Sequence, residues 1–257
     1  MKLLVKLGGT LLDSIESRMA ISAQIAAVVK TFPQTVVVHG GGKQMTRYLT
    51  EHNVESKFVD GLRVTSPAIV DAVLKVFAGT VNHLLVSCLV SQGADAVGLS
   101  GIDACLTEAV QLSPELGAVG KVIRANPKVL DVLTAGGFLP VVACVAGDRH
   151  GNIYNVNADQ MAVACAVGFA ATKLLFLTDV DGVRGADGSI VPVLTVAQSQ
   201  RLIDDGIATG GMQAKLNAAA AALDGGVAEV VIAPGAMPDV LSRLLAGEPI
   251  GTRFVRN

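Results

Sequence analysis

Short runs of consecutive apolar residues alternate along the chain with longer segments in which apolar residues recur every three or four positions. The short runs are typical of strands buried on both faces of a parallel sheet, and the longer segments are typical of helices that cover such a sheet. The pattern predicts strands at Leu3–Leu7, Thr35–His39, Ala96–Leu99, Pro140–Val145, Lys173–Thr178 and Glu229–Ile232.

Predicted helices separate these strands. They lie at Ser14–Lys30, from about Gln44 onward, and at Pro67–Ser91, Pro127–Thr134, Asn157–Phe169, Ala197–Asp204, Met212–Leu223 and Asp239–Leu245. Cys105–Ile123 alternates at shorter intervals, as hairpins do, and Asp60–Ser66 is expected to be a loop. The alternation predicts an α/β fold with a largely parallel sheet. A division near residue 171 would give an N-terminal lobe of residues 1–171 and a C-terminal lobe of residues 172–257.

Composition fits this picture. Hydrophobic residues make up 51% of the 257 positions but aromatic residues only 4%, so the core must consist mainly of Ala, Val, Ile and Leu. The formal net charge is −2. No general basic field exists to attract nucleic acid, and we expect no nucleic-acid partner.

We expect no membrane span and no signal peptide. The longest apolar stretch tested, "MAVACAVGFAAT", ends at Lys173 and is shorter than the roughly 20 residues that a span requires. Lys6 and a glycine pair interrupt the apolar start, which predicts a buried first strand. The four cysteines, Cys88, Cys105, Cys144 and Cys165, show no paired spacing. Reduced core cysteines in a cytoplasmic protein are favoured over a metal or disulfide framework.

Glycines follow the first two predicted strands, in "KLGG" at Lys6–Gly9 and "HGGGK" at His39–Lys43. Neither segment matches the Walker A loop or the dinucleotide fingerprint. Free backbone N–H groups at a strand-to-helix turn can nevertheless bind an anion. Ligands of open α/β sheets bind beyond the carboxyl ends of the strands, so these loops are candidate phosphate sites. The alternative is that both are simply tight turns.

Several charged and polar residues accompany these loops. Lys6 ends an apolar strand, and Lys215 follows a glycine pair in an alanine-rich helix. Cations beside N–H donors suit phosphoryl transfer, although each lysine alone could lie at the surface. "YNVNADQ" supplies Asp159, which could orient two lysines, together with Asn155 and Asn157. Helix capping explains Asn157 equally well. Arg63, in "DGLRVT", could bind a carboxylate or remain solvated in its loop.

These motifs, with "LTDVDGV", "TGGMQAKLNAA" and "GTRF", occur in an order that resembles the amino acid kinase family over essentially the whole chain. The resemblance is to the branch that phosphorylates the γ-carboxylate of N-acetyl-L-glutamate with ATP in arginine biosynthesis. It implies a three-layer α/β/α sandwich. The N-terminal lobe would bind the acetylated amino acid and form the dimer, and the C-terminal lobe would bind ATP.

The resemblance also implies roles for individual residues. Lys6 and Lys215 match the lysines that stabilise the transferring phosphoryl group, and Asp159 matches the aspartate that orients both lysines. Backbone N–H groups of Gly9 and Gly41 would bind the phosphoryl group. The substrate-binding residues would be Gly41, Gly42, Arg63, Asn155 and Asn157. The nucleotide-binding residues would be Thr178, Asp179, Val180, Asp181, Gly182, Val183, Arg184, Ile207, Ala208 and Thr209.

The resemblance implies Mg²⁺ bound mainly through the phosphate oxygens of ATP, with no metal site made by side chains. The scheme requires no general base, because a glutamate-type carboxylate, whose pKa is ordinarily roughly 4.3, is already ionised at neutral pH. We therefore expect His39 to be structural. Lys43 and Gln44 stand where many members have a proline and an acidic residue, and Ala104 stands where a glycine is common. Neither departure removes a catalytic position.

Two alternatives remain open at this point. The same chemistry could act on N-acetyl-2-aminoadipate, because one methylene changes binding by only about 1–3 kcal/mol. A non-catalytic amino acid or nucleotide sensor on the same fold is expected to have lost Lys6, Lys215 or Asp159, and all three are present.

The resemblance further implies an assembly. Arginine-inhibited members carry an extra helix ahead of the first strand, whereas only Met1 and Lys2 precede it here. We therefore expect a homodimer that arginine does not inhibit. The apolar helix Pro67–Ser91 is a candidate contact surface, unless it serves only to pack against the sheet.

Overall fold

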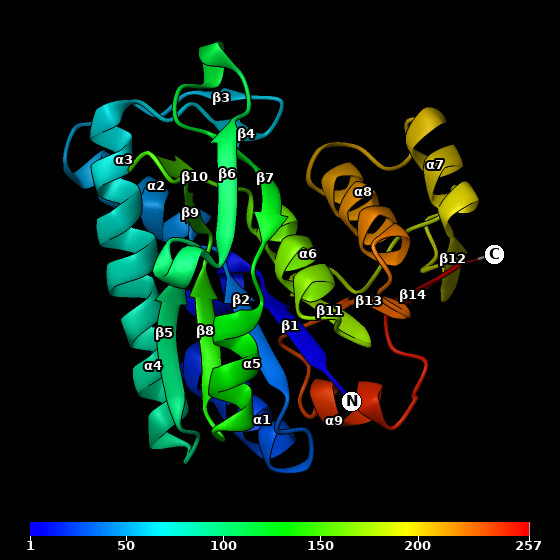
Figure 1. The fold of residues 1–257 in the computed structure, drawn as a ribbon. Coiled ribbons are helices and arrows are strands. Elements are labelled where there is room, and N and C mark those ends of the chain that lie inside the picture. Colours follow the sequence, from blue (N-terminus) through cyan, green and yellow to red (C-terminus); the bar gives the residue numbers. More distant parts are fainter. Residues whose placement is uncertain (257) are drawn as a thin grey trace.

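A continuous sheet of eight strands runs through the computed structural model, which describes residues 1–256 (Figure 1). In chain order the strands are β1 (Leu3–Leu7), β2 (Thr35–His39), β5 (Ala96–Ser100), β8 (Leu139–Ala143), β11 (Lys173–Thr178), β12 (Val193–Thr195), β13 (Glu229–Pro234) and β14 (Thr252–Val255). Their order across the sheet is β12-β14-β13-β11-β1-β2-β8-β5. Every neighbouring pair is parallel except β13 and β14. The predicted, largely parallel sheet is confirmed.

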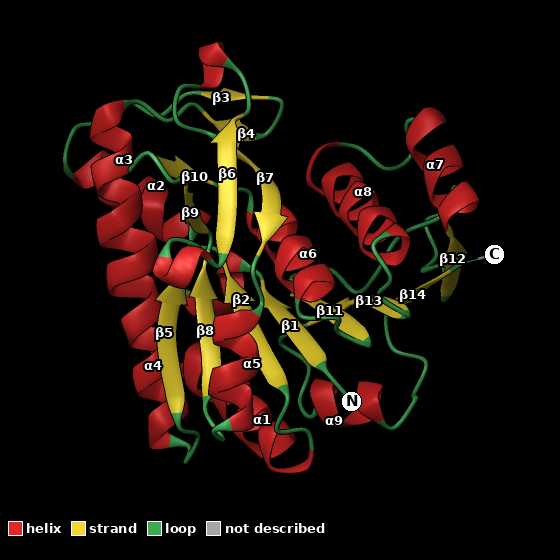
Figure 2. Ribbon diagram, viewed as in Figure 1, coloured by secondary structure: helices red, strands yellow, loops and turns green. Residues whose placement is uncertain are grey.

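Helices cover both faces of this sheet, which gives the expected three layers (Figure 2). On one face α1 (Ile15–Thr31) packs against α4 (Asn82–Ser91) and α9 (Val240–Leu245). On the other face α6 (Ala158–Gly168) packs against α8 (Gly210–Asp224), while α5 (Lys128–Ala135) covers β8. α2 (Gly42–Glu51) follows β2, and α7 (Val196–Asp204) packs against α8.

A second, four-stranded sheet covers one end of the molecule. It contains β6 (Thr107–Gln111), β7 (Gly120–Ala125), β9 (Val145–Gly147) and β10 (Ile153–Asn155), in the order β10-β9-β6-β7. The antiparallel pairing of β6 with β7 confirms the hairpin predicted in this region. The expected strand Pro140–Val145 was wrong at its end, because β8 stops at Ala143 and a separate strand begins at Val145 and joins the smaller sheet.

The sequence analysis missed several short elements. Part of the expected loop Asp60–Ser66 belongs to a hairpin of β3 (Phe58–Val59) and β4 (Leu62–Arg63), while β12 and β14 form an edge of the main sheet. Several helix starts differ from the prediction by one or two residues: α2 begins at Gly42, α8 begins at Gly210, and α9 begins at Val240 because Asp239 has a left-handed backbone with φ of 55°.

The long helix predicted at Pro67–Ser91 is present as α3 (Pro67–Val73), a π-helical segment (Leu74–Val81) and α4. By length and composition alone it could cross a membrane, with a mean hydropathy of 1.7 over its most apolar window. The stretch "MAVACAVGFAAT", on which we based the expectation of no membrane span, is therefore not the most span-like segment of the described chain. Only 39% of that window is buried in the protein, although the helix packs against α1 and β5. Length and hydropathy are weak evidence of a membrane span when a helix also packs against a sheet.

The register of the parallel strands brings the glycine loops to one edge of the sheet. Leu7 of β1 lies opposite His39 of β2 and Leu177 of β11. The residues that follow Leu7, His39 and Leu177 therefore lie side by side at the carboxyl ends of these three parallel strands. The loops that begin at Gly8, Gly40 and Thr178 meet beyond this edge.

His39 ends β2 and is completely buried. Its Nδ1 lies 2.8 Å from the carbonyl oxygen of Gly40, and its Nε2 lies 2.9 Å from Nδ2 of Asn82. An amide nitrogen only donates, so Nε2 accepts this bond and Nδ1 carries the proton. Burial lowers the pKa of His39 to about 4. His39 is thus a neutral residue that fixes the start of the second glycine loop to the long helix.

We predict that His39 makes the protein sensitive to acid. The pKa of His39 is lower in the folded chain than the 6.5 that is usual for histidine. The neutral form of His39 therefore contributes to the free energy of unfolding above about pH 6.5. About 3 kcal/mol of this contribution is lost as the pH falls towards 4. His39→Asn keeps a donor but cannot titrate. Urea titrations across this pH range should show that the free energy of unfolding depends less on pH in the variant than in the wild type. An equal pH dependence in both proteins would contradict the prediction.

Candidate functional site

The two glycine loops face each other beyond the ends of β1 and β2. A Cβ atom added to Gly9 would lie 3.8 Å from the backbone nitrogen of Gly42, the first residue of α2. No side chain caps the N-terminus of this helix. The unpaired N–H groups of a helix start and its partial positive charge favour a bound anion. The loops therefore combine into one region suited to a phosphate or a carboxylate.

Packing explains part of the glycine content. A Cβ atom on Gly41 would lie 2.9 Å from the ring of Phe77, and one on Gly8 would lie 3.1 Å from the carbonyl oxygen of Leu177. A Cβ on Gly42 would meet nothing within 4 Å. Packing does not require glycine at Gly9 or Gly42, which both line the cavity, so close approach of a ligand is the better explanation at these two positions. Close packing already accounts for Gly8 and Gly41.

A buried carboxylate joins two lysines beside these loops. Lys6 Nζ lies 2.6 Å from Oδ1 of Asp159, and Lys215 Nζ donates a hydrogen bond to Oδ2 at 3.2 Å. Lys6 and Asp159 are only 6% and 5% exposed. Burial acts to raise the pKa of Asp159, but the charges and hydrogen bonds of Lys6 and Lys215 outweigh it and lower this pKa. The three residues form an ionised cluster with a net charge of +1.

Three separate elements supply this cluster. Lys6 comes from β1, Asp159 from the first turn of α6, and Lys215 from α8. Asn157 caps α6, accepting hydrogen bonds from the backbone N–H groups of Asp159 at 2.9 Å and Gln160 at 3.3 Å. The cap fixes the helix turn that presents the carboxylate to both lysines.

Arg63 is a second buried cation, 8% exposed. It donates hydrogen bonds to the hydroxyls of Ser56 and Thr46, the latter at 2.9 Å, and lies 4.6 Å above the ring of Phe58. It makes no ion pair within residues 1–256. A buried guanidinium without a carboxylate partner is costly, and it suits an incoming anion. The alternative of a solvated loop arginine is excluded by this burial.

These groups line one cavity of about 370 Å³. Its walls bring together positions from both halves of the chain: Lys6, Gly8, Gly9, Thr10, Gly42, Lys43, Thr46, Phe58, Arg63, Thr178, Asp179 and Lys215. A larger cavity of about 850 Å³ lies between α6, α8 and β7 and shares Lys215 with the first. Lys215 therefore stands where the two cavities adjoin.

Some predicted site residues lie elsewhere. Asn155 lines neither cavity, and its amide donates to the hydroxyl of Thr65 at 3.0 Å. Thr65 in turn donates to the carbonyl oxygen of Arg63 at 2.8 Å. Asn155 is thus connected to the site through the backbone that carries Arg63. Asn157 lines the larger cavity, but its oxygen is already used for capping.

The predicted nucleotide segments occupy the C-terminal half. Thr178 and Asp179 reach the smaller cavity, whereas Val183 is buried in the core. Val180, Asp181, Gly182 and Arg184 continue the same loop after β11, and Ile207, Ala208 and Thr209 lead into α8. Thr209 is the N-cap residue of α8, but its side chain makes no capping bond.

Sequence reasoning missed the residues that support Arg63. Thr46 lies one helical turn after Gly42 and donates to the carbonyl oxygen of Gly42 at 2.9 Å. This i, i+4 spacing within the predicted helix is the signal that could have placed Thr46 near the glycine loop. Ser56 and Phe58 belong to the missed hairpin and its approach.

Known proteins resemble this chain over most of its length. The amino acid kinase family matches the chain over residues 1–234. An acetylglutamate kinase of Solibacter usitatus is 66% identical over 255 residues, which cover 99% of each chain. An acetylglutamate kinase of Acidobacterium capsulatum is 44% identical over 95% of each chain.

Solved structures of other proteins share the fold. N-acetylglutamate synthase of Neisseria gonorrhoeae, complexed with coenzyme A and N-acetyl-glutamate, superposes with a TM-score of 0.86 at 24% identity. The superposition covers 100% of the present chain and 59% of that longer chain. Carbamate kinase of Giardia lamblia, bound to AMP-PNP, gives a TM-score of 0.73 at 14% identity and covers 100% and 98%. The family match over residues 1–234 and the 66% identical relative show that the chain belongs to the amino acid kinase family.

Proposed function

We propose that the protein transfers the γ-phosphoryl group of ATP to the γ-carboxylate of N-acetyl-L-glutamate, a step of arginine biosynthesis. The observation that carries this proposal is the set of three cations, Lys6, Lys215 and Arg63, around two facing glycine loops. The 66% identity to an acetylglutamate kinase over nearly the full chain supports this choice of substrate.

In the proposed reaction an oxygen of the γ-carboxylate attacks the γ-phosphorus of ATP. A carboxylate oxygen–phosphorus bond forms, the bond from the γ-phosphorus to the bridging oxygen breaks, and ADP leaves with the bonding electrons. Lys6 and Lys215 neutralise charge on the moving phosphoryl group, N–H groups of Gly9 and Gly41 bind its oxygens, and Gly41 and Gly42 line the amino acid site. No proton moves, because the nucleophile is already ionised.

The other predicted residues hold the reactants. Arg63 binds the α-carboxylate of the amino acid, and Asn155 supports Arg63 through Thr65. Thr178–Arg184 and Ile207–Thr209 bind the nucleotide. Asp159 holds both lysines in place, because its carboxylate is shared by their ammonium groups. We assign amino acid binding to residues 1–171 and ATP binding to the lobe that begins at residue 172.

Magnesium fits this scheme as an ion carried by the nucleotide. Within residues 1–256 no group of three His, Cys, Asp or Glu side chains could hold a metal. The ion would be held mainly by phosphate oxygens, where it reduces their negative charge. Because ATP is a cytoplasmic substrate and the four cysteines are unpaired, we place the protein in the cytoplasm.

A substrate panel tests the function directly. With ATP and Mg²⁺, N-acetyl-L-glutamate should stimulate ADP release, and hydroxylamine should trap the acyl phosphate as a hydroxamate. N-acetyl-2-aminoadipate and free glutamate are the competing substrates. A larger kcat/KM for either of them would reassign the substrate, and ADP release that no acid stimulates would contradict the kinase activity.

Lys215→Ala and Arg63→Ala should affect different kinetic constants. Lys215 is proposed to contact charge that develops during transfer, so its loss should lower kcat by ~10²–10³ and change KM little. Arg63 binds a carboxylate equally in the ground and transition states, so its loss should mainly raise KM for N-acetyl-L-glutamate. Thermal melting serves as the control for folding. The same changes in kcat and KM in both variants would contradict the separate roles of Lys215 in transfer and Arg63 in substrate binding.

We also propose a homodimer that forms through the exposed face of helix Pro67–Ser91. Leu84 and Val90 on this face are 45% and 54% exposed. Light scattering during size exclusion should give twice the 26.3 kDa chain mass. Leu84→Glu should yield a monomer, whereas Val132→Glu, a substitution at an exposed apolar residue of α5, should not. A monomeric wild-type protein, or a dimeric Leu84→Glu variant, would refute this interface.

A further inference from the structure

Lys43 lies in the first turn of α2, and the proposed mechanism gives it no task. A lysine is unfavourable there, because the start of a helix carries a partial positive charge. The first turn of α2 contains no acidic residue, and no side chain caps the helix. A position that departs from local preference in this way is often functional. The side chain also lines the 370 Å³ cavity together with Lys6 and Lys215.

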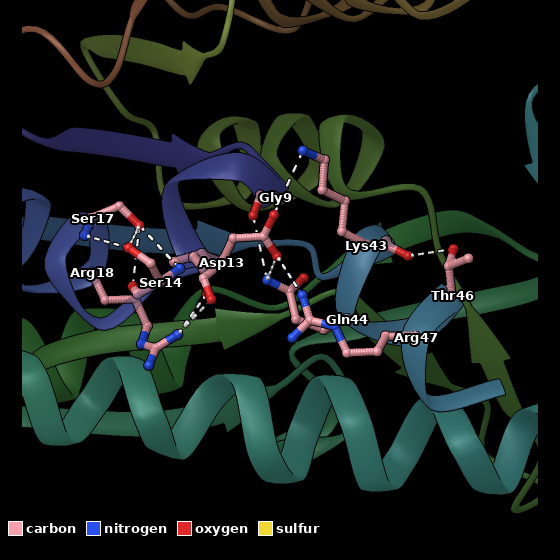
Figure 3. A network of polar contacts seen from close by, with 11 residues as sticks. Gly9, Asp13, Ser14, Ser17, Arg18, Lys43, Gln44, Thr46 and Arg47 are labelled. Carbon is pink, nitrogen blue, oxygen red and sulfur yellow. Dashed lines mark hydrogen bonds and ion pairs between the residues drawn. The ribbon is translucent and has the colours of Figure 1, made fainter. Parts of the chain in front are cut away.

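The side chain of Lys43 reaches back from α2 towards Asp13, as Figure 3 shows. Its Nζ lies 3.6 Å from Oδ2 of Asp13, while Arg47 Nη2 lies 3.6 Å from Oδ1. Gln44 Nε2 donates a hydrogen bond to the same Oδ1 at 3.1 Å. The carboxylate of Asp13 thus interacts with two cations and one amide group. The Lys43 side chain is 58% exposed, and neither cation is held at hydrogen-bonding distance.

This cluster lies against the first glycine loop. Asp13 directly follows the short helix Gly9–Leu12, and Gln44 Nε2 also approaches the carbonyl oxygen of Gly9 at 3.4 Å. Lys43 therefore extends towards Gly9, on the side of the cavity where the phosphoryl group is proposed to lie. Arg63, by contrast, donates to Thr46 and approaches the carbonyl oxygen of Gly42, within α2.

We propose that Lys43 is an additional binding residue for the γ-phosphate of the nucleotide, and that Asp13 holds its ammonium group beside Gly9 when no phosphate is bound. This inference rests on the proposed kinase function. Lys43 would leave the weak pair with Asp13 for the more highly charged γ-phosphate. Arg47 would continue to balance the charge of Asp13, and Gln44 would continue to donate a hydrogen bond to it.

Binding of two nucleotides tests this assignment without turnover. Calorimetry with Mg²⁺ compares AMP-PNP, which has a γ-phosphate, with ADP, which has none. Lys43→Met should weaken AMP-PNP binding by about five- to tenfold, the size expected for one exposed charge-assisted contact. ADP binding should change by less than about twofold. Lys43→Arg should retain most of the AMP-PNP affinity.

Asp13→Asn tests the partner of Lys43. The substitution keeps the side-chain shape but weakens the hold on Lys43, so AMP-PNP should bind more tightly. The gain should disappear in the double variant Asp13→Asn, Lys43→Met. A gain that persists in the double variant would reflect only the lost negative charge and would overturn the role of Asp13.

Lys128→Met is the matched control. Lys128 is exposed and also begins a helix, but it lines neither of the two cavities. It should leave both affinities unchanged. Wild-type AMP-PNP affinity in Lys43→Met, or equal weakening of AMP-PNP and ADP, would overturn the assignment to the γ-phosphate and leave the kinase function intact. A wild-type protein that binds neither nucleotide would overturn both.

Discussion

The carboxylate of Asp159 is the interaction on which the site depends. It connects Lys6 of the central strand β1 with Lys215 of α8, and thereby the first and last thirds of the chain. The buried ammonium group of Lys6 would be costly to keep charged alone, and the shared carboxylate compensates it together with that of the half-buried Lys215. Removing it would leave Lys6 as an unpaired buried cation, at a typical cost of about 3–5 kcal/mol, and Lys215 as a half-buried one.

The cluster also explains how the fold prepares the site for phosphoryl transfer. The protein loses the hydration of its cations during folding, before any substrate is present. Two of them share one counter-charge, and Arg63 has none within the described chain, so the cavity retains an excess of positive charge. Such preorganised charge stabilises a developing negative charge without reorganisation during the reaction. Desolvation of these cations thus costs folding free energy, and bound anions can offset that cost.

The sequence predicted the central strands well because strands buried on both faces consist almost entirely of apolar residues, as in β1 and β2. It failed at β3, β4, β12 and β14, because strands of two to four residues are too short to carry such a run and depend on tertiary pairing. Lys6, Asp159 and Lys215 are brought together as expected. The bond of Asn155 to Thr65 was not predictable, since no spacing rule relates residues 90 positions apart. The cluster of Asp13 with Lys43 depends equally on two loops meeting in space.

The place of β1 in the sheet has a consequence for how the chain acquires its structure during synthesis. β1 is made first, and one of its edges pairs with β2 about thirty residues later, but its other edge pairs with β11, which begins only at Lys173. Contacts so distant in sequence form late. Until β11 emerges from the ribosome, β1 has an edge that can pair with other chains. Lys6 forms its ion pair only after Asp159 has been synthesised. A lysine in that strand disfavours its pairing with the apolar strand of another molecule, so we expect the charge that the site requires to disfavour aggregation of the nascent chain as well.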